Sequence, residues 1–170
     1  MHHRPNDERK LKMATFPAPQ TGILLTHFIV SEDIARSRRF YADVLGGEVV
    51  IDGDPTIVAL ANGWIVINVG GPPTEDKPTV TLTAPDPHAT SSFLNIRVAN
   101  IQEIYEDWSS KGAKFLTPPI DRGAELRCYM RDPDGHLIEV GQANHDFLKE
   151  HLSSDPTKAS VKRATHEATP

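Results

Sequence analysis

A short apolar strand that directly follows a turn carries a carboxylate, and a carboxylate in that position needs a chemical explanation. Residues 131–140 read RDPDGHLIEV, so that a Pro-Asp-Gly turn precedes Glu139, which stands between Ile138 and Val140. Pro fixes φ in such a turn, Asp caps it locally and Gly accepts a positive φ. An ionised Glu on a buried strand is costly unless it is paired or bound to a cation. Glu139 therefore either points to solvent from a half-exposed strand or belongs to a functional site.

Composition and charge exclude several classes of protein. The chain has 170 residues, which fits one ordinary domain or two small repeated halves that share a core. Its net charge of −5, without a basic face, argues against nucleic acid as a partner. No segment is long and apolar enough to span a membrane, and residues 1–20 lack the apolar run of a secretory signal. Cys128 is the only cysteine, which excludes an internal disulfide and a cysteine-based zinc site. We expect a cytoplasmic protein.

The same order of elements occurs twice along the chain. The first half predicts a strand, a helix and three strands over residues 23–30, 31–44, 48–51, 56–61 and 64–69. The second half predicts the same order over residues 92–98, 100–111, 114–116, 125–130 and 136–140. An internal repeat is a strong organisational signal. We therefore predict an α+β fold built from two βαβββ units.

Domain boundaries follow from the composition between and around these units. We predict a single domain over residues 21–143, with units at 22–70 and 91–143 and a Gly/Pro-rich linker at 71–90. Residues 1–20 are expected to form a disordered tail, and residues 144–170 a short helix with a mobile C-terminal tail.

Two motifs within this repeat carry a family resemblance. Phe40-Tyr41 stands before Leu45-Gly46 in the first unit, and Asp132–Glu139 closes the second. In order and spacing these residues resemble the vicinal oxygen chelate superfamily, which includes glyoxalase I, extradiol dioxygenases, fosfomycin-modifying enzymes and bleomycin-resistance proteins. The resemblance implies that the strands curl into a cup, that side chains on the first and last strands of the units hold a divalent metal, and that two chains form a homodimer.

The resemblance can be carried to individual positions. His27 matches the usual ligand on the first strand, and Glu139 matches the usual carboxylate on the last strand. The other two positions depart from the family pattern. Asn95 stands where the second unit would offer His or Glu, and Ile67, or Asn68 after a slip of one residue, stands where the first unit would offer a carboxylate.

Strand alternation gives a prediction that does not depend on the resemblance. Phe28 and Val30 are expected to face the helix, which would place His27 on the opposite, cup-lining face. The same reasoning on the later strands directs the residues between the apolar ones into the cup. The predicted polar lining is His27, Asn95, Arg97, Arg127, Tyr129 and Glu139.

Two functions remain open for this cup. The first is a metalloenzyme, a lyase, isomerase or dioxygenase acting on a small oxygenated compound, with His27 and Glu139 holding Zn, Fe, Mn, Co or Ni. Glu139 could alternatively serve there as the catalytic base. The substrate contacts expected in either case are Asn95, Arg97, Arg127, Tyr129, Trp64 and Asn68.

The second function that the resemblance implies is a metal-independent protein of the bleomycin-resistance kind, which would sequester an acidic or polar small molecule in the same cup. Arg97 or Arg127 would then pair with Glu139. Tyr129 and Trp64 would cover an aromatic ring of the ligand. A homodimer is expected in both cases, because it would also bury exposed strand edges.

Overall fold

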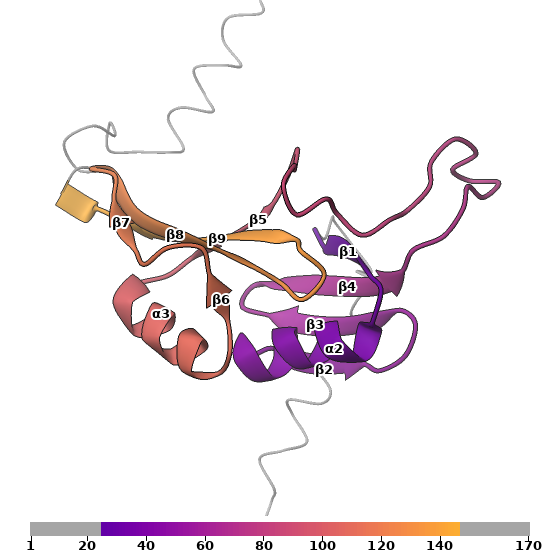
Figure 1. The fold of residues 1–170 in the computed structure, drawn as a ribbon. Coiled ribbons are helices and arrows are strands. Elements are labelled where there is room, and N and C mark those ends of the chain that lie inside the picture. Colours follow the sequence, from indigo (N-terminus) through magenta and orange to yellow (C-terminus); the bar gives the residue numbers. More distant parts are fainter. Residues whose placement is uncertain (1–24, 147–170) are drawn as a thin grey trace, which may run out of the picture.

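The computed structural model describes residues 25–146, which form two β-sheets with helices packed against them (Figure 1). The α+β fold predicted from the repeat is confirmed. The predictions for residues 1–20 and for the tail after residue 146 lie outside the described residues. Within residues 25–146, no helix has the length and apolar character needed to cross a membrane.

The first unit forms a four-stranded sheet in the order β1-β4-β3-β2. Its elements are β1 (His27–Ser31), α2 (Ile34–Arg39), the π-helical turn η1 (Phe40–Val44), β2 (Glu48–Ile51), β3 (Thr56–Leu60) and β4 (Gly63–Val69). Strands β1 and β4 run parallel, while β2, β3 and β4 are antiparallel neighbours. The helix starts later than predicted, because Asp33 provides the N-cap and its side chain accepts a hydrogen bond from Arg36 N at 3.0 Å.

The second unit repeats this topology with strand order β5-β9-β8-β6, and a short strand β7 also pairs with β8. Its elements are β5 (Leu94–Arg97), α3 (Ile101–Ser110), β6 (Lys114–Phe115), β7 (Ile120–Asp121), β8 (Glu125–Arg131) and β9 (Leu137–Ala143). Strands β5 and β9 are parallel, as β1 and β4 are in the first unit. Asn100 is the N-cap of α3, since its side chain accepts a hydrogen bond from Glu103 N at 3.2 Å.

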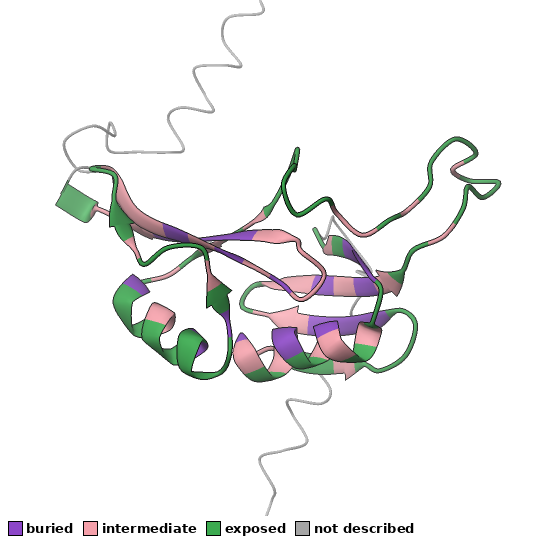
Figure 2. Cartoon of the chain, viewed as in Figure 1, coloured by how far each residue is buried: buried purple, intermediate pink, exposed green. Residues whose placement is uncertain are grey.

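Buried residues lie in both units (Figure 2), and their apolar side chains form one hydrophobic core that joins the units. It combines buried side chains from η1, α3 and the helix-facing sides of both sheets, among them Phe40, Tyr41, Ile67, Trp108, Met130 and Ile138, and the partly buried Ile34 of α2 packs against it. The helix-facing sides therefore meet in one core, and the opposite face of each sheet points away from it.

The first strand presents its residues to the opposite faces from those predicted. Ile29 packs in the core, and Ser31 Oγ lies 3.0 Å from Ser37 Oγ on α2, whereas Phe28 is 48% exposed. By alternation His27 shares the face of Ile29, so the prediction that this face lies opposite the helix is wrong. The physical reason is that Ile29 and Val30 are both buried, which removes the apolar–polar alternation that would reveal the face.

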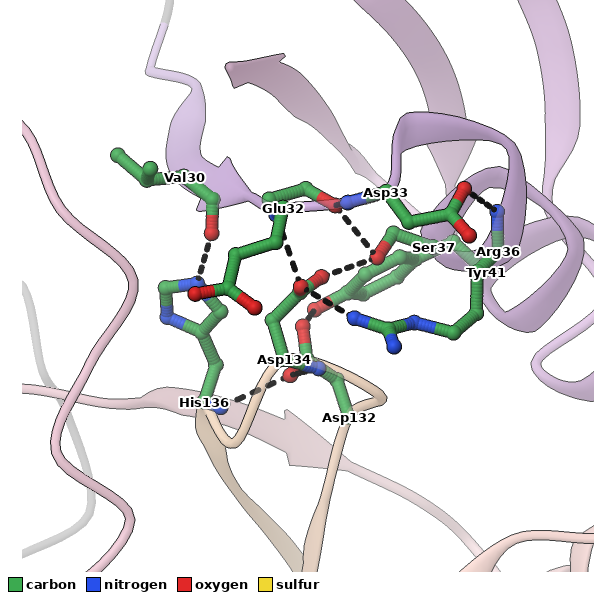
Figure 3. Close-up of polar contacts among 10 residues, drawn as sticks. Val30, Glu32, Asp33, Arg36, Ser37, Tyr41, Asp132, Asp134 and His136 are labelled. Atoms are coloured by element: carbon green, nitrogen blue, oxygen red, sulfur yellow. Dashed lines mark hydrogen bonds and ion pairs between the residues drawn. The ribbon is translucent and has the colours of Figure 1, made fainter. Parts of the chain in front are cut away.

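The turn between β8 and β9 fastens the second unit to the first (Figure 3). The Asp134 side chain is fully buried and accepts hydrogen bonds from Glu32 N at 3.0 Å, from Arg36 Nη2 at 2.7 Å and from Ser37 Oγ. Burial alone would raise the pKa of Asp134, but the hydrogen bonds from Ser37, the Glu32 amide, Ser31 and Arg36 outweigh it and hold that pKa below its ordinary value.

Two further side chains form hydrogen bonds between the units. Tyr41 Oη donates to Asp132 Oδ2 at 2.9 Å, and His136 Nε2 donates to the carbonyl of Val30 at 2.8 Å. His136 thereby ties the start of β9 to β1. The Asp-Pro-Asp-Gly turn thus fixes where β9 begins, and with it the position of Glu139.

Candidate functional site

Glu139 is held on β9 between two side chains from the neighbouring strands. Its register partners are Asn95 on β5 and Tyr129 on β8. Asn95 Nδ2 donates to Glu139 Oε1 at 2.5 Å, and Tyr129 Oη donates to Glu139 Oε2 at 2.5 Å. The Glu139 side chain is only 7% exposed, so these two donors satisfy a carboxylate that water barely reaches.

Two arginines and a second glutamate extend this arrangement. Arg97 Nη1 lies 2.6 Å from Glu125 Oε2 and 3.8 Å from Glu139 Oε1. Arg127 Nη1 lies 3.5 Å from Glu125 Oε1. Together with Asn95 and Tyr129 these residues make up what we call the Glu139 cluster, in which two guanidinium charges balance two carboxylates.

Glu125 was not among the site residues predicted from the sequence. Its position two residues before Arg127 carried the necessary signal, because residues i and i+2 of a strand share a face. The predicted pairing of an arginine with Glu139 takes a weaker form than expected, since Arg97 makes its shorter contact with Glu125.

Aromatic rings line the same face of the second sheet. The Arg127 guanidinium lies 5.9 Å from the centroid of the Tyr129 ring, and the Phe93 ring meets that ring edge-on at 6.1 Å. Arg127 Nε is buried and has no hydrogen-bond acceptor among residues 25–146. The hydrogen bond to Glu139 raises the pKa of Tyr129, with burial adding to the effect, so the phenol remains a donor near neutral pH.

The donor set around Glu139 does not fit a divalent metal ion. Both carboxylate oxygens accept from protein groups, and the neighbours are an amide, a phenol and a guanidinium, none of which is a usual ligand for these metals. The described part of the chain holds no group of three or more His, Cys, Asp or Glu side chains that could bind an ion. Metal binding by His27 and Glu139 therefore stays a prediction, and no chemical step is derived from it.

His27 has surroundings of its own. It lines a small hollow of about 190 Å³ together with Phe28, Phe93 and His136. Burial, with the charge of His136 adding to it, lowers the pKa of His27. The imidazole is therefore neutral near pH 7.

Trp64 and Asn68 belong to the first sheet. Both stand on β4 at positions that alternate with the core residues Ile65 and Ile67, which places them on the face that points away from the core. Asn68 Nδ2 donates to Asp54 Oδ1 at 3.0 Å. Trp64 and Asn68 therefore stand on the first sheet, whereas the Glu139 cluster stands on β5, β8 and β9 of the second sheet.

A cavity of about 450 Å³ opens beside the Glu139 cluster. Asn95 and Arg97 on β5 line one side of it, and Leu60 and Asn62 at the β3–β4 turn line the other. Part of the first unit is thus within reach of a molecule bound next to Glu139.

The fold and the second-unit motif agree with the comparison against known families. The chain belongs to the glyoxalase/bleomycin resistance protein/dioxygenase superfamily, whose model matches residues 24–140. This confirms the family resemblance drawn from the Phe40-Tyr41 and Asp132–Glu139 motifs.

Similar proteins differ widely in what their names describe. The virulence protein STM3117 of Salmonella typhimurium is 28% identical over 123 residues, which cover 69% of this chain and 83% of that protein. An integron cassette protein from Vibrio cholerae has a similar structure, with a TM-score of 0.56 and 24% identity over 73% of this chain and 97% of the other. The antibiotic binding protein TnmS3 from Streptomyces sp. CB03234 has a TM-score of 0.54 at 15% identity, over 74% of this chain and 99% of the other. The structural likenesses show the fold alone.

Proposed function

We propose that this protein binds a small polar molecule with a planar ring, without a metal ion, at the Glu139 cluster. The proposal rests on one observation: each carboxylate oxygen of Glu139 accepts a hydrogen bond from a protein side chain, one from Asn95 and the other from Tyr129. A carboxylate held in this way is a fixed, desolvated acceptor that orders its neighbours. To coordinate a cation, Glu139 would have to lose the hydrogen bonds from Asn95 and Tyr129.

The surrounding groups supply the two kinds of contact that such a ligand needs. Arg127 Nε is a buried donor without an acceptor in residues 25–146, and a polar ligand atom would supply one. Phe93 and Tyr129 offer aromatic surface beside it. The charges of the cluster balance internally, which favours a polar ligand over a strongly charged one.

A homodimer would complete this site. The outward face of the first sheet carries Trp64, Asn68 and the half-exposed Phe28, whereas the Glu139 cluster stands on the second sheet. A second copy could bring its own first sheet against the cluster and enclose a ligand between two chains. The antibiotic binding protein with the same fold provides a precedent for ligand binding on this scaffold.

A ligand screen with a metal chelator tests the proposal. Compounds with a planar ring and polar substituents are screened for thermal stabilisation with and without excess EDTA, and the hits are titrated by calorimetry into wild type, Arg127→Met and Arg122→Met. Arg122 is an exposed arginine outside the cluster and serves as the matched control. Arg127→Met should weaken binding about tenfold, the equivalent of one charge-assisted hydrogen bond, while Arg122→Met should match wild type. Binding that EDTA abolishes, or equal affinity in Arg127→Met and wild type, would contradict the proposal.

A further inference from the structure

A second cavity, of about 510 Å³, lies at the junction of the two units. Its walls include Arg36 of α2 and Phe40 of η1 from the first unit, and Lys114, Phe115 and Arg131 from the second. It shares no lining residue with the cavity beside Glu139. We propose that this inter-unit cavity is a separate binding site for a small organic anion with an apolar body, such as an aromatic carboxylate.

The charge of the lining favours an anion. Arg36, Lys114 and Arg131 contribute three positive charges, and the carboxylate in the wall is Asp132. That carboxylate is engaged by its own turn, since it accepts from Tyr41 Oη at 2.9 Å, from His136 N at 2.8 Å and from Asp134 N at 3.0 Å. The lining therefore keeps an excess of positive charge.

The arginines are only partly satisfied by the protein. Arg131 Nη1 donates to a neutral acceptor, the Gly135 carbonyl, at 3.3 Å. Arg36 Nη2 pairs with Asp134, as Figure 3 shows, but Arg36 Nε is buried without an acceptor in the described residues. A buried donor without an acceptor destabilises the folded protein. An anionic oxygen in the cavity that Arg36 lines would supply one.

The remaining wall is apolar and selects the body of the ligand. Phe40 and Phe115 form part of it, and Leu116 at the rim is 52% exposed. The Phe115 ring is held by the Tyr105 ring, with centroids 4.8 Å apart. A bare inorganic anion would leave this apolar surface uncovered, whereas a ring or short chain would bury it. The volume lies in the range of about 300–1,000 Å³ that small-molecule sites occupy.

This site is independent of the function proposed for the Glu139 cluster and is tested with 1-naphthoate as the probe. The full chain is titrated by calorimetry with 1-naphthoate and with the uncharged 1-naphthalenemethanol. Lys114→Met is the principal variant, because Lys114 is exposed and its replacement leaves the core untouched. Arg131→Met is the second, and equal melting temperatures confirm that each variant is folded.

The controls separate this site from the rest of the surface. Lys111→Met removes a nearby exposed lysine outside the cavity, and Arg127→Met disturbs the Glu139 cluster instead. We expect 1-naphthoate to bind wild type, Lys111→Met and Arg127→Met alike, and to bind Lys114→Met and Arg131→Met about tenfold more weakly. Equal binding of the alcohol and the acid to Arg127→Met, in which the Glu139 cluster is disturbed, would overturn the inference. No binding of 1-naphthoate to wild type, or a loss confined to Arg127→Met, would also overturn it.

Discussion

Replacing Asp134 by asparagine tests how the Asp-Pro-Asp-Gly turn holds the two units together. The fully buried carboxylate accepts from Glu32 N, Arg36 Nη2 and Ser37 Oγ on the first unit. An asparagine side chain at this position would keep the shape and one acceptor oxygen but lose the negative charge. The substitution therefore isolates the charge from the packing.

The expected loss follows from these contacts. A hydrogen bond to a charged group contributes about 1.5–3 kcal/mol and a neutral one about 0.5–1.5 kcal/mol, so each converted bond loses about 1 kcal/mol. Arg36 is 42% exposed, and its share is reduced by solvent screening. We expect the free energy of unfolding to fall by about 2 kcal/mol, which corresponds to a shift of about 1 M in the urea midpoint.

The loss should also depend on pH in one direction. Because the pKa of Asp134 in the folded protein lies below its ordinary value of 3.8, the charged carboxylate stabilises the fold fully above the unfolded pKa. That contribution is lost as the pH falls through the folded pKa. The gap between wild type and Asp134→Asn should be constant from about pH 6 to 8 and should narrow below about pH 4.

Urea unfolding followed by circular dichroism, at a single protein concentration, measures both effects. The matched control is Asp107→Asn, since the Asp107–Lys111 pair has the same 2.7 Å separation as the Asp134–Arg36 pair but is 45% exposed at Asp107. The control should change the free energy of unfolding by less than about 0.5 kcal/mol. If Asp134→Asn and Asp107→Asn cost the same, the turn does not hold the units as described.

Three further substitutions or reactions test other parts of the structure. Gly141→Ala would place a Cβ against Arg97 Nη1, the end of a flexible side chain. The free energy of unfolding should change by less than about 1 kcal/mol, while calorimetry should show weaker ligand binding at the Glu139 cluster. A large loss of stability would contradict this expectation. Gly47→Ala would place a Cβ 2.8 Å from the backbone oxygen of Tyr41 and should cost about 2–3 kcal/mol in urea unfolding, so a neutral result would show that the close approach is absent. Cys128 is 1% exposed, and burial raises the pKa of its thiol to about 11. Mass spectrometry should therefore find the thiol unmodified by iodoacetamide in the folded protein and modified in urea. Rapid labelling of the folded protein would show that the thiol is not buried.

The strands of the second unit could be interpreted from the sequence because each has one face in the core and one outside it. On β8, Cys128 and Met130 are buried while Arg127 and Tyr129 alternate with them. This alternation correctly placed Tyr129 and Glu139 on one face, where the structure joins them by a hydrogen bond. The first strand gave no such signal, because Ile29 and Val30 are both buried.

Contacts between distant segments could not be predicted in the same way. The sequence assigned Asp134 to a turn, which is correct, but its partners Glu32 and Ser37 lie 102 and 97 positions away along the chain. Whether Glu139 binds a metal or hydrogen-bond donors could not be predicted from the sequence for the same reason. It depends on which side chains the fold brings to the carboxylate, and Asn95 comes from 44 residues away.

We propose that hydrogen-bond donors, and not a metal ion, hold Glu139. The most direct test is elemental analysis of tag-free protein after dialysis against a mixture of Zn, Mn, Fe, Co and Ni salts. Wild type, His27→Ala and Glu139→Gln are compared, so that any metal bound elsewhere on the chain cancels. We predict the same metal content in all three proteins. One ion per chain in wild type that is lost in both His27→Ala and Glu139→Gln would contradict the claim.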